Sequence, residues 1–153
     1  MAQKSKKAYI VQTALPLFLQ NGFKGTSIDM VVKKSAVSKP TVYNHFSDKA
    51  ALILAVTEHW VAANKPNLPG QIDADGLTSL VDRKWLSEDA IGFYALMIGE
   101  GWRFPMAKQV FWKQFDEIWR KALDYVWRRA TNINQESLDM MLDQQLLARL
   151  KQR

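Results

Sequence analysis

The chain contains no cysteine and no apolar run long enough to cross a membrane. Disulfide bonds and thiolate chemistry are therefore excluded, and so is a membrane-spanning helix, which needs about 20 consecutive apolar residues. The basic stretch at residues 1–7 also lacks the apolar segment of a signal peptide. Since thiols are kept reduced in the cytoplasm, these features together predict a cytoplasmic protein.

Residues that commonly perform catalysis are scarce as well. The 153 residues include only two histidines, His45 and His59. The sequence has no glycine-rich phosphate loop, no nucleophile motif and no metal-ligand spacing. We therefore expect no enzyme, no bound metal and no cofactor.

Positive charge is concentrated in the first third of the chain. Residues 1–50 contain eight lysines and two acidic residues, a net charge of +6, whereas the remainder has 13 basic and 13 acidic residues. A polyanion would be drawn to the first third and not to the rest. By itself the excess is equally consistent with a solubilising lysine face.

Apolar residues recur at helical spacing along most of the chain, and no segment alternates with the period of a strand. The breaks predict helices at residues 6–20, 28–34, 38–44, 48–63, 77–85, 87–103 and 106–130, with a last one that begins at 132 or 134 and ends near 151. Asn21-Gly22 should end the first helix, Pro16 should bend it, and Ser47 should cap the fourth. We predict an all-α fold with two units, residues 1–63 and 64–153.

The second and third predicted helices are short and joined by a three-residue turn, as in a DNA-binding helix-turn-helix. Val31, Val32, Val37, Val42 and Phe46 form the expected buried set. The other side chains of residues 38–45 then point outward, where hydroxyl and ammonium groups suit phosphates and amide or imidazole groups suit base edges. The N-terminus of the second helix could also hold a phosphate.

Residues 7–60 resemble the N-terminal domain of the tetracycline-repressor-like (TetR) family of bacterial transcriptional regulators. The segments Val37-Ser38-Lys39 and Thr41-Val42-Tyr43-Asn44-His45-Phe46 are close to a family signature. The resemblance implies a homodimer that binds double-stranded DNA in the bacterial cytoplasm, in association with the nucleoid. The candidate DNA-binding residues are Thr26, Ser27, Ser38, Lys39, Pro40, Thr41, Tyr43, Asn44, His45 and Lys49.

The chain departs from the family pattern at two positions. Similar proteins often have glycine at position 40, and Pro40 removes a backbone amide that could contact phosphate. They often have glutamate at position 50, where Ala50 cannot complete a capping box.

Aromatic residues crowd the second unit, and residues 99–105, Gly-Glu-Gly-Trp-Arg-Phe-Pro, are similar to a segment of some C-terminal domains in that family. The likeness implies a helical domain for effector binding and dimerisation. The aromatic stripe at residues 111–127 is best explained by core packing. The alternatives are a surface for a partner chain or a pocket for a small hydrophobic or aromatic effector, with candidate lining residues Phe93, Met97, Trp102, Phe104 and Trp119.

Two functions follow from these patterns. The favoured one is a sequence-specific transcriptional regulator, a repressor that a ligand releases from DNA. The alternative is a regulator-like adaptor whose C-terminal unit binds a protein partner and not a small molecule.

Overall fold

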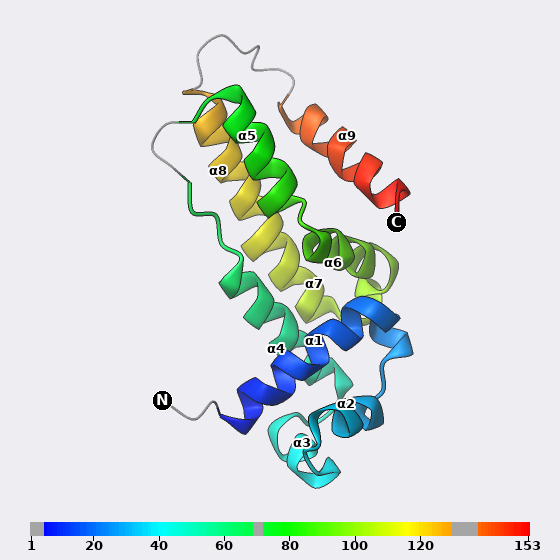
Figure 1. The fold of residues 1–153 in the computed structure, drawn as a ribbon. Coiled ribbons are helices and arrows are strands. Elements are labelled where there is room, and N and C mark those ends of the chain that lie inside the picture. The colour runs from blue at the N-terminus through cyan, green and yellow to red at the C-terminus, as the bar shows by residue number, and fades with distance from the viewer. Residues whose placement is uncertain (1–4, 69–71, 130–137) are drawn as a thin grey trace.

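The computed structural model describes residues 5–68, 72–129 and 138–153, which are folded almost entirely into helices (Figure 1). No described residue is in a strand, so the all-α prediction is confirmed. The elements in chain order are α1 (Lys6–Gly25), α2 (Ile28–Ser35), α3 (Lys39–His45), α4 (Lys49–Ala63), α5 (Ala74–Leu80), η1 (Val81–Trp85), α6 (Glu88–Gly99), η2 (Gly101–Arg103), α7 (Pro105–Phe111), η3 (Trp112–Asp116), α8 (Glu117–Trp127) and α9 (Leu138–Lys151). None of these described helices is long and apolar enough to cross a membrane.

Helices α1 to α3 lie at the lower end of the molecule in Figure 1, and α1 to α4 contribute buried residues to one hydrophobic core that continues into the second half. Phe18 and Phe23 of α1 pack edge to face, with ring centroids 5.6 Å apart. Val31 of α2 and Val42 of α3 are fully buried in the same core. The first helix is interrupted at Gly22, whose φ of 79° and ψ of 170° are not helical, whereas Pro16 lies within α1 without such a break. The predicted stop at Asn21-Gly22 therefore has a backbone cause.

The N-cap of α4 differs from the prediction. Asp48, not Ser47, accepts a hydrogen bond from the backbone N–H of Ala51, at 2.8 Å. A capping side chain bonds the amide two or three residues further on, and α4 begins one residue later than predicted. That shift places the cap at Asp48, and a capping-box glutamate would belong at position 51 instead of 50.

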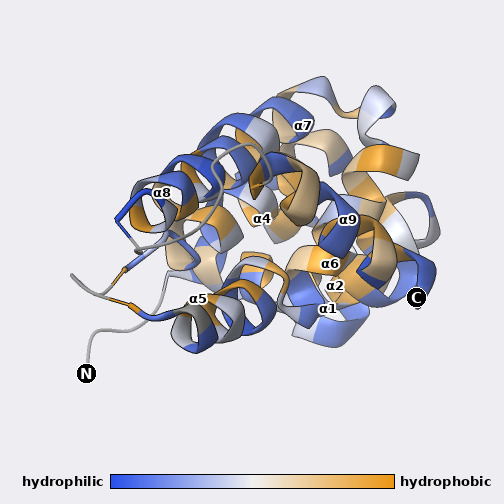
Figure 2. Cartoon of the chain, turned by 90° about the horizontal axis from the view of Figure 1, so that it is seen from above, coloured by the Kyte–Doolittle hydropathy of each residue, from blue (hydrophilic) through white to orange (hydrophobic). Residues whose placement is uncertain are grey.

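The second half is a helical bundle with an aromatic core. Trp60 of α4 contacts Phe93 of α6 and Phe115 of η3, with centroids 4.5 and 4.7 Å away. The helix predicted at residues 106–130 is a nearly continuous rod over residues 105–127, in which η3 is a π-helical segment. Residue 130 and the predicted start of the last helix, at 132 or 134, lie outside the described residues. Seen from above, the hydrophilic residues of α8 follow its outer side and its hydrophobic residues face α4 (Figure 2). Core packing therefore describes most of the aromatic stripe, for example Phe111, Phe115 and Trp119, but not all of it, because Ile118 and Tyr125 are 40% and 55% exposed.

One polar network crosses the aromatic core. The Tyr94 hydroxyl donates to Asp116 at 2.5 Å, and Arg120 Nε donates to both carboxylate oxygens of Asp116 at 3.1 Å. Arg120 Nη2 also donates to Asp143 of α9 at 2.6 Å. Burial, and next the charge of Asp116, raise the pKa of the Tyr94 phenol well above its usual range. The network thus links Tyr94 of α6 and Arg120 of α8 to Asp143 of α9, although the pair with Asp143 is largely exposed and contributes at most about 1 kcal/mol.

Candidate nucleic-acid interface

Two serine caps and a left-handed residue shape the helix-turn-helix. Ser27 Oγ accepts from the backbone N–H of Met30 at 3.1 Å and starts α2. Helix α2 ends at Ser35 and is followed by Ala36, whose φ is 53°, a left-handed conformation that ends helices. Ser38 then caps α3 by accepting from the backbone N–H of Thr41 at 3.3 Å. The turn between the two helices is therefore defined by local chemistry.

Helix α3 presents most of its side chains to solvent. Only Val42 within it is buried, and Phe46, which follows it, is 3% exposed. Tyr43 is 45% exposed although it is large and aromatic. The exposed candidates at this surface are Ser27, Ser38, Lys39, Pro40, Tyr43, Asn44 and His45, and Thr41 is half-buried. In Figure 1, α3 lies at the end of the molecule opposite α5, α8 and α9, so none of those helices covers it.

Lys39 pairs with Asp29 across the turn. Its Nζ lies 2.8 Å from the Asp29 carboxylate, and both side chains are more than half exposed. The hydrogen bond to Asp29, and next the charge of Asp29, raise the pKa of Lys39. Because an exposed ion pair contributes at most about 1 kcal/mol, a phosphate could replace Asp29 as the partner of Lys39.

Thr26 is placed differently from the expectation that it contacts DNA. Its side chain is fully buried, and its hydroxyl lies 3.0 Å from the carbonyl oxygen of Leu17 and 2.8 Å from that of Gly22. The hydroxyl thus joins the backbone on the two sides of residues 18–21, at the break in α1. Thr26 is therefore a structural residue and is not available to a phosphate.

Lys49 also has a structural partner. Its Nζ donates to the carbonyl oxygen of Phe23 at 2.8 Å, and the side chain is half-buried. The contact fixes the start of α4 to the end of α1. The charge of Lys49 still adds to the positive surface, but one of the three N–H donors of its ammonium group is already in use.

Glu100 is a residue that the sequence analysis did not single out. Its two carboxylate oxygens accept from the backbone N–H groups of Phe23, at 2.8 Å, and Lys24, at 2.7 Å. Glu100 lies between α6 and η2, so this contact joins the second half to the helix-turn-helix unit. The only signal in the sequence is a carboxylate between two glycines, Gly99 and Gly101, where the helix ends.

The five residues proposed for a hydrophobic pocket do not line one cavity. Phe93, Met97 and Trp119 are buried in the filled core, whereas Trp102 is 73% exposed. Phe104 packs edge-on against Phe23 of α1, with centroids 5.4 Å apart. The structure therefore divides this set between the core, the surface and the contact with α1. Nor do three His, Asp or Glu side chains gather as metal ligands in the part of the chain that the structure describes.

The helix-turn-helix segment matches a known protein family. Residues 10–56, from α1 into α4, match the family of bacterial regulatory proteins named tetR. This N-terminal third of the chain is similar to the TetR family of regulators. The resemblance noted in its sequence is thus confirmed, and the match covers the helix-turn-helix together with the helices that brace it.

Several regulators are similar to this chain. The HTH-type transcriptional regulator YuxN of Bacillus subtilis is 37% identical over 57 residues, which are 37% of this chain and 20% of that protein. UidR of Escherichia coli is 31% identical over 103 residues, which are 63% of this chain and 52% of UidR. The chain thus spans about half, or less, of the length of these curated relatives.

Two solved structures share the TetR-like fold beyond the matched domain. A protein described as a TetR-family transcriptional regulator from Mesorhizobium loti has a TM-score of 0.62 at 22% identity, over 84% of this chain and 69% of that one. Salmonella enterica GusR has a TM-score of 0.62 at 17% identity, over 99% of this chain and 83% of its own. At these identities the likeness shows the fold alone.

Proposed function

We propose that this protein is a sequence-specific DNA-binding transcriptional regulator that acts on bacterial DNA in the cytoplasm, in association with the nucleoid. In this proposal, residues 1–63 bind the duplex, and residues 64–153 bind an effector and form a homodimer. The observation that carries it is helix α3, whose polar and aromatic side chains face solvent above a buried Val42 and Phe46. The concentration of positive charge in residues 1–50 supports the same conclusion.

The side chains of α3 divide into two classes of contact. Tyr43, Thr41 and Lys39 carry hydroxyl or ammonium donors that suit phosphate oxygens and position the helix. Asn44 and His45 are exposed near the end of α3, where their side chains can pair with base edges in the major groove. The amides that start α2, next to Ser27, offer a further phosphate contact.

Repression with release by a ligand is the finer part of the proposal. Helix-turn-helix proteins bind two half-sites as dimers, and a ligand that prefers one dimer geometry shifts the population away from the DNA-bound form. The Glu100 contact supplies a route, because it connects the second half to the backbone just before α2. The relatives named above are regulators and give no support to the adaptor alternative.

Selection of bound duplexes from a random pool tests the proposed function. The expected result is enrichment of a palindromic consensus, because two identical α3 helices would read two half-sites. The variant Tyr43→Ala should weaken binding to every duplex, while Tyr125→Ala is the matched control, since Tyr125 is 55% exposed but lies on α8. No enrichment, or equal loss in both variants, would contradict the proposal.

A further inference from the structure

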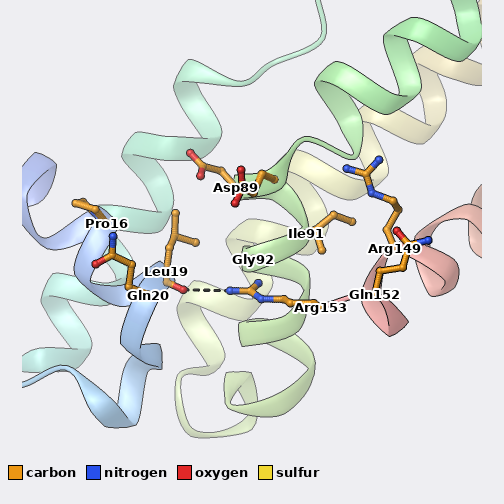
Figure 3. A pocket seen from close by; sticks show the side chains of 10 residues that line it. Pro16, Leu19, Gln20, Asp89, Ile91, Gly92, Arg149, Gln152 and Arg153 are labelled. Atoms are coloured by element: carbon orange, nitrogen blue, oxygen red, sulfur yellow. Dashed lines mark hydrogen bonds between the residues drawn. The ribbon is translucent and has the colours of Figure 1, made fainter.

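A polar cavity of about 580 Å³ opens between α1, the start of α6 and the end of α9 (Figure 3). Leu19 of α1 and Ile91 of α6 supply its apolar lining, and Gly92 lies between them. At Gly92 an added Cβ would lie 2.9 Å from Leu19 Cδ2 and 3.0 Å from Arg153 Nη1. The absence of a side chain there lets the guanidinium of Arg153 extend across α6 to α1.

Two arginines line this cavity without a carboxylate partner. Arg149 Nη2 donates to the carbonyl oxygen of Leu86 at 3.2 Å, and Arg153 Nη2 donates to that of Leu19 at 3.1 Å. Neither guanidinium has a carboxylate within 4.0 Å among the residues that the structure describes. Each guanidinium carries five N–H donors, so these carbonyl bonds fix its position and leave donors for a ligand.

The first turn of α6 supplies negative charge to the same cavity. Glu88 and Asp89 line it, and in Figure 3 Asp89 lies on the side away from Arg149. Both carboxylates also stabilise the N-terminus of α6. Neither carboxylate forms an ion pair with either arginine among the described residues. In Figure 3 the guanidinium of Arg153 lies beside Leu19, on the same side as Asp89 and apart from the guanidinium of Arg149.

We propose that this cavity binds a small zwitterion and that this ligand is the effector of the protein. Its carboxylate is held by Arg153, whose guanidinium matches a planar oxyanion by paired hydrogen bonds, and Arg149 adds positive charge to the same cavity. Its ammonium group faces Glu88 and Asp89. The effector role, though not the binding site, rests on the regulator function proposed above.

The cavity has a direct connection to the DNA-binding unit. Arg153 holds the carbonyl of Leu19, three residues before the break in α1 at Gly22. A carboxylate that competes for the Arg153 guanidinium changes this contact between α9 and α1. Binding of a ligand in the cavity is thereby coupled to the position of α1, the helix that braces α2 and α3.

Amide NMR of the full chain tests the site with glycine, β-alanine, 4-aminobutyrate and 6-aminohexanoate as probes. At least one zwitterion at millimolar concentration should shift the amide signals of Leu19, Ile91 and Gly92, while 4-aminobutyramide and butyrate, which each lack one charge, should bind more weakly. Arg153→Gln should weaken binding about tenfold, because a hydrogen bond to a charged group is lost, and Arg149→Gln, which removes only a more distant positive charge, should weaken it less. Arg83→Gln is the control, since Arg83 is exposed and lies outside the cavity.

The binding proposal is overturned if no zwitterion shifts these signals, or if the arginine variants bind as well as the control. Duplex affinity measured without a ligand tests the regulator function separately, so a protein that binds DNA and no zwitterion refutes only this inference. A zwitterion that binds and leaves duplex affinity unchanged would overturn the effector role. Gly92→Ala tests the site without a loss of charge, because the added Cβ should displace Arg153 and weaken binding of the zwitterion. Gly99→Ala is its control and should leave binding unchanged, since no atom lies within 4 Å of the new Cβ.

Discussion

Replacing Glu100 with alanine should loosen the helix-turn-helix unit from the rest of the chain. The carboxylate of Glu100 accepts two backbone hydrogen bonds, from Phe23 at 2.8 Å and Lys24 at 2.7 Å. A hydrogen bond to a charged group contributes about 1.5–3 kcal/mol, and the bond to Lys24 lies at an exposed position, where it contributes less. We therefore expect Glu100→Ala to lower the free energy of unfolding by about 2–4 kcal/mol.

Urea denaturation measures the total loss, and hydrogen exchange at the amides of Phe23 and Lys24 measures it locally. Glu100→Gln keeps one acceptor oxygen and should recover roughly half of the lost stability. The control is Glu58→Ala, because Glu58 is exposed on α4. If Glu100→Ala were no less stable than the control, and the two amides exchanged no faster, the Glu100 contact would not brace the unit.

Three further predictions follow from the described geometry. Asn44→Ala should change the preferred duplex sequence in a selection experiment, because its amide can read a base edge; an unchanged consensus would place Asn44 away from the bases. Gly22→Ala should lower the free energy of unfolding, measured by urea denaturation, by about 1–3 kcal/mol, because a side chain at φ 79° is strained and its Cβ would lie 2.9 Å from Glu100 Oε2. Gly25→Ala should lower it less, because the nearest atom to its added Cβ is 3.5 Å away. Equal losses in the two variants would argue against strain at Gly22. The pKa of Tyr94 is raised in the folded chain. Its phenol therefore stabilises the fold below about pH 10, where an unfolded tyrosine is still neutral, and this contribution is lost as the pH rises further. Tyr94→Phe should reduce the decline of the unfolding free energy above that pH, and an unchanged decline would contradict the raised pKa of Tyr94.

The DNA-binding unit was predictable because its determinants are local. Caps at Ser27 and Ser38, the stop at Gly22 and the buried Val42 all lie within a few residues of the elements that they define. The prediction of Ser47 as the cap of α4 was wrong for a local reason too, because Ser47 and Asp48 are adjacent and both can cap a helix. Only the exact start of the helix decides between them.

The contacts between distant segments could not be predicted. Glu100 meets residues 76 and 77 positions away, and Arg153 meets Leu19 across 134 positions. No periodicity or spacing reports such pairs. The same limit explains why the residues proposed for a hydrophobic pocket do not line one cavity. The apolar character of Phe93 and Trp102 does not reveal that Phe93 is buried and Trp102 is exposed.

The central claim is that α3 and the lysines around it bind duplex DNA, and the salt dependence of duplex affinity tests it most directly. Fluorescence anisotropy with the selected duplex should show the affinity falling about a thousandfold between roughly 50 and 200 mM salt, as expected when several lysines displace counterions from phosphates in each half of a dimer. Affinity that stays constant over this range, or that Tyr43→Ala leaves unaltered, would contradict the account.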